Sequence, residues 1–318
     1  MLRVMLLLFT LALLAAAGAA LWAAQALTRP LPIDAPVIVE VAPGAALGQV
    51  AASLAARGIL PTPELLTAWG RVTGKAAGLH VGEYRVEPGT DARGLLEQFV
   101  RGKVLRRSLT LLPGWRFGDV RRALEAAPRL AQTLGDADGA EIMARLGAPG
   151  VAPEGRFFPD TYDYVAGDTD LALLRRAHAR MQAVLAEEWA RRVPDLPLTS
   201  PDEALVLASL IEKETGVATD RARIAGVFTR RLELGMRLQT DPAVIYGLGD
   251  AFDGNLTRRD LRTPTPWNTY MNSGLPPTPI ALPGRESIRA ALAPAVDSAL
   301  YFVARGDGSS EFSATLAE

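Results

Sequence analysis

The chain has 318 residues, enough for two globular units and an accessory segment. Its 35 acidic and 34 basic residues nearly cancel, so no overall field favours nucleic acid as a partner. Cysteine is absent, which excludes disulfides, thiolate catalysis and sulfur-ligated metals, and two histidines argue against a histidine-rich metal site. Among metal sites, the sequence therefore predicts neither a cysteine-ligated nor a histidine-rich one.

The first segment is a candidate for crossing a membrane. Residues 5–26 contain no charge and would form a helix about 33 Å long, which matches a bilayer core. Arg3 precedes this run and Arg29 follows it. The alternative is a cleaved signal peptide, since Ala24 and Ala26 would suit a signal peptidase, but the run exceeds the usual ~7–15 apolar residues. We predict an uncleaved single-pass anchor, and under either alternative the rest of the chain is exported.

The remainder divides into a linker and two folded regions. The anchor covers residues 1–27, and three prolines in residues 28–36 predict an extended linker. Residues 37–86 show a β-type run, two helical stretches and a second β-type run, which predicts a compact βααβ module. We assign residues 37–104 to the domain that contains this module. Residues 105–318 form a second, mixed helical and β domain, and so the fold class is α+β.

The clearest helix start lies in the second domain. Ser200 as N-cap, Pro201 at the first helical position and Glu203 at N3 predict a capping box. This helix should run to about Thr215. Thr219 is then placed to cap the helix that follows.

Two further elements frame a long loop region. His178 lies in a long helical stretch whose charges fall mainly on one side, and we expect it at the surface or its boundary. Near the C-terminus, the sequence predicts a β-hairpin with Asp307 and Gly308 in its turn. Residues 236–285 lie between this helical region and the hairpin, and they are rich in Pro, Gly, Thr and Asn. Such a long structured loop is uncommon unless it builds a binding site.

Motif elimination leaves carboxylate chemistry. The lysines are Lys75, Lys103 and Lys213, and none follows a serine by three residues, which excludes an S-x-x-K acyl-transfer site. The sequence also contains no G-x-S-x-G, no H-E-x-x-H and no phosphate-binding G-x-x-x-x-G-K-[ST].

Two glutamates interrupt an otherwise apolar helical run, ALVLASLIEKETG. Glu212 shares its helix face with small uncharged residues such as Ala208 and Ser209, and Glu214 lies about 200° around the helix. Periodicity does not choose between them, and both could simply be solvated. A carboxyl in apolar surroundings has a raised pKa, however, and can then donate a proton near neutral pH, as the acid of a glycosidase does.

Several segments together resemble one family. They are ASLIEKETG, GVFTRRLELGMRLQTDPAVIYG, LTRRDLRTPTPWNTYMNSGLPPTPIALPG, YFVARGDGSSEFS and, upstream, PEGRFFPDTYDY. These segments resemble the YceG-like family of endolytic murein transglycosylases, densely over residues 150–313 and more weakly over 37–104. The resemblance implies a membrane anchor, a LysM-like module and a catalytic domain, in that order.

The resemblance also implies roles for individual residues. The first glutamate of the family's I-E-K-E segment is catalytic, which corresponds to Glu212, and Glu214 takes a supporting position. Groups that would contact the glycan are Gln239, Thr240, Asp241, Asn268 and Tyr270, together with Glu154 and Asp160, which could equally be structural. Trp267 stands where family members commonly have tyrosine, so a hydroxyl has no role there.

The implied activity is a lytic transglycosylase reaction. The enzyme would cleave MurNAc–GlcNAc bonds of nascent peptidoglycan strands and leave 1,6-anhydro-MurNAc ends, terminating glycan elongation. It would be a single-pass inner-membrane protein with its catalytic domain in the periplasm, or the equivalent extracytoplasmic face, and cell-wall synthases are the protein partners to expect. The alternatives are a muramidase that uses water and a non-catalytic cell-wall scaffold.

Overall fold

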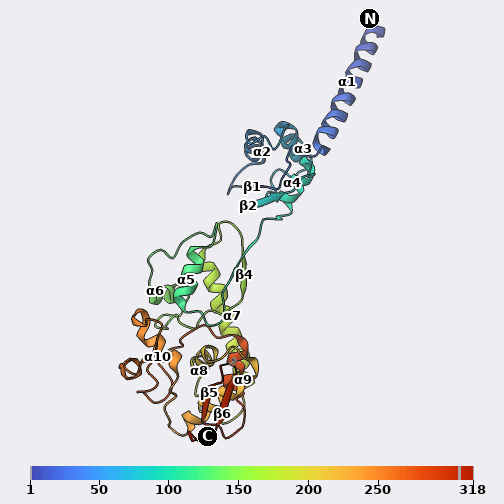
Figure 1. Cartoon of the computed structure of the whole chain (residues 1–318). Coiled ribbons are helices and arrows are strands. Elements are labelled where there is room, and N and C mark those ends of the chain that lie inside the picture. The colour runs from blue at the N-terminus through green and yellow to red at the C-terminus, as the bar shows by residue number, and fades with distance from the viewer. Residues whose placement is uncertain (1, 307–308, 318) are drawn as a thin grey trace. The chain divides into compact units, whose positions relative to one another are not determined.

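The chain folds into two units, each described here by itself (Figure 1). The computed structural model describes residues 2–306 and 309–317. The first unit contains the chain up to Arg107 together with Val165–Gly167, and the second contains Ser108–Tyr164 and the chain from Asp168 onward.

The first unit is built on a two-stranded antiparallel sheet. Strand β1 (Val37–Val41) pairs with β2 (Gly82–Val86), so that Val39 lies opposite Tyr84. Between the two strands the chain forms α2 (Leu47–Ala56) and α3 (Pro63–Val72), and α4 (Ala92–Val100) follows. The predicted βααβ order is confirmed. Alternating strand residues and one face of each helix bury a shared apolar core, which includes Val39, Leu54, Leu66, Tyr84 and Phe99.

The apolar N-terminal segment forms one helix, α1 (Leu2–Thr28), and Arg3–Thr28 is long and apolar enough to cross a membrane. A signal sequence would pass the same test. The last turn of α1 and the residues just after it contribute to the core of the first unit, because Leu27 and Leu31 are only 3% and 5% exposed. The N–H of Leu31 donates to the carbonyl of Thr90 at 2.8 Å. The start of the expected linker is thus packed against the module.

The second unit surrounds one buried helix, α8 (Pro201–Glu214). This helix contacts α7, α9, α10 and α11. Strand β3 (Arg107–Thr110) begins at the boundary of this unit. The remaining elements of the unit are α5 (Phe117–Glu125), α6 (Gly139–Arg145), β4 (Thr161–Tyr164), α7 (Asp170–Ala190), α9 (Ala218–Glu233), α10 (Asp241–Leu248), η1 (Gly249–Ala251), η2 (Asp260–Arg262), α11 (Arg285–Leu292), β5 (Tyr301–Ala304) and β6 (Ser310–Ser313). Strands β3 and β4 pair with each other, as do β5 and β6.

The predicted helix starts are confirmed only in part. The Ser200 hydroxyl accepts the N–H of Glu203 at 3.2 Å, as an N-cap should. The Glu203 carboxylate, however, accepts the N–H of Thr199 rather than that of Ser200, so the reciprocal half of the capping box is displaced by one residue. The cap predicted at Thr219 is wrong, because α9 already begins at Ala218 and its N-cap is Val217.

The expectation for His178 is also wrong. The imidazole is buried, with its ring 6.1 Å from that of Phe157. It is enclosed because α7 packs against β4 as well as against α8 and α11, so more than one face of the helix is covered. The predicted C-terminal hairpin is confirmed by the antiparallel pairing of β5 with β6, and its expected turn residues Asp307 and Gly308 lie outside the described residues.

The packing of Leu31 gives a test of whether the linker is part of the first unit. Leu31→Ala should destabilise this unit by about 2–5 kcal/mol, the usual loss for a buried leucine. Hydrogen exchange of the β2 amides in the detergent-solubilised full chain measures it. Val72→Ala is the control, since Val72 is 84% exposed on α3 and should change little. Equal exchange in both variants would show that residues 28–36 are a free tether.

Candidate active site

Helix α8 carries both glutamates out of the core at its C-terminal end. Every residue from Ala204 to Ile211 is buried, and most of them belong to the main apolar cluster of the unit. Glu212 and Glu214 are half-buried, and Lys213 between them is exposed. The two carboxylates point to different neighbours, because side chains two residues apart lie about 200° around a helix.

Glu212 is bound to the start of α11. Its Oε2 accepts the N–H of Gly284, the N-cap of that helix, at 2.9 Å and the hydroxyl of Ser287 at 2.7 Å. Donors at a helix N-terminus are typical partners of a carboxylate anion. These contacts tie the end of α8 to α11. Neither partner could be predicted from the sequence, because both lie more than 70 residues further along the chain.

Glu214 occupies a different environment. Burial raises its pKa from 4.5 to about 7; a hydrogen bond donated by the Thr240 hydroxyl to Oε1 opposes this rise, and the negative charge of Asp241 adds to it. A carboxyl with this pKa is protonated in a substantial fraction of molecules near neutral pH and can exchange its proton there. Glu214 therefore has the property that the sequence led us to expect at Glu212.

Polar groups from two loops gather around Glu214. Thr240 is buried and forms the N-cap of α10, with Asp241 as the first residue of that helix. The Tyr270 hydroxyl donates to Asp241 Oδ1 at 2.6 Å. Burial and the charges of Asp241 and Glu214 raise the pKa of Tyr270, so its hydroxyl remains a donor. The N–H of Thr240 donates to the hydroxyl of Thr269 at 3.0 Å, which joins the two loops.

Gln239 extends this cluster to the surface. It is exposed and has a positive φ of 52°, a strained conformation for a residue with a side chain. The buried guanidinium of Arg231 supports this turn by donating to the Leu238 carbonyl at 2.8 Å and, more weakly, to Gln239 Oε1 at 3.4 Å. The structure thus brings Glu214, Thr240, Asp241 and Tyr270 together, with Gln239 beside them.

Asn268 shapes the loop instead of facing a ligand. Its side chain is fully buried, its amide donates to the carbonyls of Leu261 and Thr263, and its Oδ1 accepts the N–H of Tyr270. All of these contacts are made within the loop. We therefore correct its expected role from glycan contact to support of Tyr270.

Glu154 also has a supporting position. It is buried, and its carboxylate accepts the N–H of Phe117 at 3.0 Å and the hydroxyl of Tyr246 at 3.2 Å. Burial raises its pKa to about 7, although these bonds and the charge of Arg116 lower it. Because Phe117 begins α5 and Tyr246 lies in α10, Glu154 joins these two helices. Of its two expected roles, these contacts favour the structural one.

Asp160 and Trp267 lie at the edges of this arrangement. Asp160 is exposed at the start of β4, where its carboxylate accepts the N–H of Thr161 and its carbonyl accepts the N–H of Leu111. These contacts belong to the β3–β4 pair. The Trp267 indole donates to the Thr278 hydroxyl at 2.9 Å, and its ring meets that of Tyr246 edge-on at 5.4 Å.

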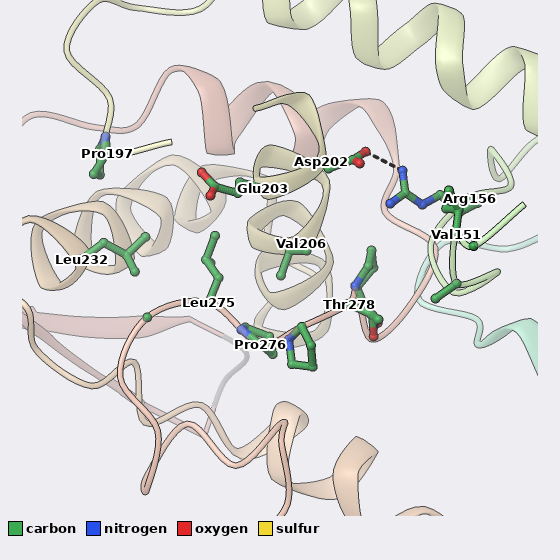
Figure 2. Close-up of a pocket in the computed structure, with 15 residues that line it drawn as sticks. Val151, Arg156, Pro197, Asp202, Glu203, Val206, Leu232, Leu275, Pro276 and Thr278 are labelled. Carbon is green, nitrogen blue, oxygen red and sulfur yellow. Dashed lines mark hydrogen bonds and ion pairs between the residues drawn. The ribbon is translucent and has the colours of Figure 1, made fainter. Parts of the chain in front are cut away.

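A cavity of about 650 Å³ lies beside the first turns of the same helix, α8 (Figure 2). Asp202, Glu203 and Val206 line it, but neither Glu212 nor Glu214 does. The cavity and the carboxyl with the raised pKa therefore lie at different places along α8. We locate the candidate active site at Glu214, because a reaction needs a group that can exchange a proton, and a cavity alone supplies none.

The fold is that of an α+β protein whose second unit surrounds one buried helix, with a carboxyl of raised pKa at the end of that helix. The chain belongs to the YceG-like family, whose sequence pattern matches residues 39–318.

Relatives with assigned names match part of the chain. This chain is 39% identical over 170 residues to the endolytic murein transglycosylase of Bacillus subtilis (strain 168). The match covers 52% of this chain and 45% of that protein. The chain is 34% identical over 155 residues to the endolytic murein transglycosylase of Streptococcus pneumoniae serotype 2 (strain D39), covering 48% of this chain and 28% of that protein. The match thus spans less than half the length of either relative.

A solved structure matches more of the chain. The crystal structure of a YceG-like protein from Listeria monocytogenes aligns with 89% of this chain and 97% of its own, with a TM-score of 0.57 and 26% sequence identity. The likeness therefore extends across both units.

The pKa of Glu214 predicts how its replacement changes stability with pH. Folding raises this pKa from 4.5 to about 7, so the folded chain holds more protons between these values. The contribution of this group to stability is fullest below about pH 4.5 and is lost as the pH rises through 7. Glu214→Gln, which cannot ionise, should stabilise the protein at pH 8 by on the order of 1–2 kcal/mol, and much less at pH 5.

Thermal unfolding of the full chain at both pH values measures this difference. Glu233→Gln is the matched control, because Glu233 is exposed on α9. A stabilisation by Glu214→Gln that is equal at pH 5 and pH 8 would contradict the raised pKa.

Proposed function

We propose that the protein is an endolytic lytic transglycosylase that cleaves MurNAc–GlcNAc bonds of nascent peptidoglycan strands and leaves 1,6-anhydro-MurNAc ends. Membership of the YceG-like family and the names of two relatives support the class of substrate and reaction. The observation that carries the proposal is the Glu214 carboxyl, whose pKa of about 7 suits proton transfer in both directions.

Glu214 is the catalytic acid and base in this proposal, in place of Glu212. Glu212 accepts two hydrogen bonds on one oxygen, Oε2, and Glu214 accepts one on Oε1, so the fold constrains Glu212 more than Glu214. The contacts of Glu212 with Gly284 and Ser287 hold the end of α8 to α11. Glu214 is bonded to Thr240, beside neutral polar side chains that suit hydroxyl and acetamide groups.

The reaction needs only one such carboxyl. Protonated Glu214 gives its proton to the glycosidic oxygen between MurNAc and GlcNAc as that bond breaks. The resulting carboxylate takes a proton from the C6 hydroxyl of the muramic ring, and the C6 oxygen attacks C1 and closes the 1,6-anhydro ring. Because the nucleophile comes from the substrate, the second carboxylate of an ordinary glycosidase is dispensable. Neither a metal nor a cofactor takes part.

The neighbours of Glu214 have distinct tasks in this mechanism. The hydroxyl of Thr240 orients the carboxyl through its hydrogen bond to Oε1. The negative charge of Asp241 helps to keep the proton on Glu214 and stabilises positive charge that develops at C1. Tyr270 fixes Asp241, and the exposed Gln239 is free to reach a sugar hydroxyl or acetamide.

The first unit places the reaction at a membrane in this proposal. Helix α1 is the anchor, the second unit is extracytoplasmic, and cell-wall synthases are the neighbouring proteins. The module over residues 37–104 acts as a LysM-like domain that binds N-acetylglucosamine-containing chains. The burial of Leu27 and Leu31 supports an anchor that is retained, because the helix end contributes to the module's core.

Paired glutamine variants test the choice of acid. Glu214→Gln is nearly isosteric but cannot titrate, and should lower the release of 1,6-anhydro ends from purified glycan strands by about 10²–10⁴-fold. Glu212→Gln keeps an acceptor for Gly284 and Ser287, and should lose much less. Mass spectrometry of the products is the readout. If Glu212→Gln is the inactive variant and Glu214→Gln is not, the acid is Glu212, as the sequence suggested.

The product mass also separates the reaction types. A 1,6-anhydro end supports the transglycosylase, a reducing end indicates a muramidase that uses water, and no cleavage by the folded full chain indicates a scaffold.

Reporter fusions test the membrane topology. An alkaline phosphatase fused after residue 318 should be active, because that enzyme folds only outside the cytoplasm, and the fusion should fractionate with the membrane at full length. A full-length fusion that is present but inactive would contradict export. A product that begins near Thr28 would contradict the retained anchor and leave the enzymatic proposal intact.

A further inference from the structure

The cavity beside the first turns of α8 is a site in its own right (Figure 2). Its volume of about 650 Å³ lies within the ~300–1,000 Å³ range of ligand pockets. Helix α8 forms one wall, and the loop that contains Leu275, Pro276 and Thr278 forms another. We call this cavity the proline groove.

Arg156 and Asp202 form an ion pair in the proline groove, and Glu203 adds a second carboxylate. Arg156 Nη1 contacts Asp202 Oδ1 at 2.5 Å, and the Glu203 carboxylate accepts the N–H of Thr199. An anionic ligand would be repelled by these carboxylates. The groove therefore disfavours an anion and is compatible with a neutral ligand.

The hydrogen-bonding groups that remain narrow the ligand chemistry. Pro276, Pro277 and Pro279 have no N–H, so their loop offers carbonyl acceptors to a ligand rich in hydroxyl donors. Arg156 lines the groove, and its guanidinium carries N–H donors that suit an amide carbonyl. Leu232 and Val206 add apolar surface that suits a methyl group. An N-acetylated sugar combines all three features.

Shared loops connect the proline groove to the candidate active site. Thr278 lines the groove and accepts the Trp267 indole N–H, and Trp267 is three residues before Tyr270. Leu232 lines the groove, and its neighbour Arg231 supports the turn at Gln239. Along α8, Glu203 precedes Glu214 by eleven residues, about 16 Å. This distance is longer than one sugar ring, and because Ala204 to Ile211 are buried, a strand that spans it must pass over the loops beside α8 and not along the helix itself.

We propose that the proline groove is a remote subsite that binds an N-acetylated disaccharide of the same strand that is cleaved at Glu214. This inference rests on the proposed function. The energy of binding a distant part of the substrate then promotes cleavage, so strands long enough to fill both places are preferred over short ones. The groove thus contributes selection of strand length.

A variant that fills the groove tests this selection. Ala152→Trp places a large ring at a lining position, and should lower kcat/KM for long glycan strands at least about tenfold while leaving a short strand that occupies only the Glu214 site unaffected. Ala186→Trp is the matched control, because Ala186 is exposed on α7. Thermal unfolding confirms that each full-length variant is folded. An equal loss on long and short strands, or no loss on either, would overturn the proposal.

Binding measured without cleavage separates the groove from the reaction. Full-length Glu214→Gln should bind the tetrasaccharide of N-acetylglucosamine, and adding Ala152→Trp should abolish this binding. Adding Arg156→Lys instead keeps a cation beside Asp202 but removes the planar guanidinium with its several N–H donors, and should weaken binding about two- to fivefold.

The proposal would be overturned if neither Ala152→Trp nor Arg156→Lys weakens the binding of the tetrasaccharide. It would also be overturned if the groove binds a synthetic stem peptide and not the sugar. If the wild-type chain cleaves no strand, the proposed function fails, and the tetrasaccharide measurement still decides whether the groove binds glycan.

Discussion

The burial of α8 is the constraint on which the second unit depends. A helix whose residues from Ala204 to Ile211 are all buried can expose side chains only at its ends. Its C-terminal end therefore brings Glu212 and Glu214 into regions where little water remains to solvate a charge. Each carboxyl must then accept hydrogen bonds or keep its proton, and the groups that surround the two carboxyls differ.

The two glutamates have different neighbours in the folded chain. Glu212 receives two donors at the start of α11 and joins two core helices. Glu214 receives one donor, from Thr240, and burial, with a smaller contribution from the like charge of Asp241, raises its pKa to about 7. Support for this site extends outward through α10, whose far half is held to α5 by the bond between Tyr246 and buried Glu154. Rigid helices on both sides thus position groups that lie in loops.

Local signals predicted much of the fold and less of the site. The βααβ order follows from short apolar runs and turn residues near each other in the chain, and the structure has it. The cap at Ser200 was predictable for the same reason, whereas the burial of His178 depends on helices that approach α7 from elsewhere. Asn268 reads as a polar loop residue in the sequence, and only its contacts with Leu261 and Thr263 assign it to the interior of the loop.

The sequence by itself determined the apolar first helix, the α+β class, the prediction of carboxylate chemistry and the family, because each depends on composition, on neighbouring residues or on the residues of a motif. Only the tertiary structure distinguished Glu212 from Glu214. The two lie on one helix turn with similar apolar neighbours, and helical periodicity treats them alike. Their difference comes from Gly284 and Ser287 on one side and from Thr240 and Asp241 on the other, which the folded chain brings in from later segments. A carboxyl's pKa is set by the groups that surround it in space, and the order of residues along the chain does not specify them.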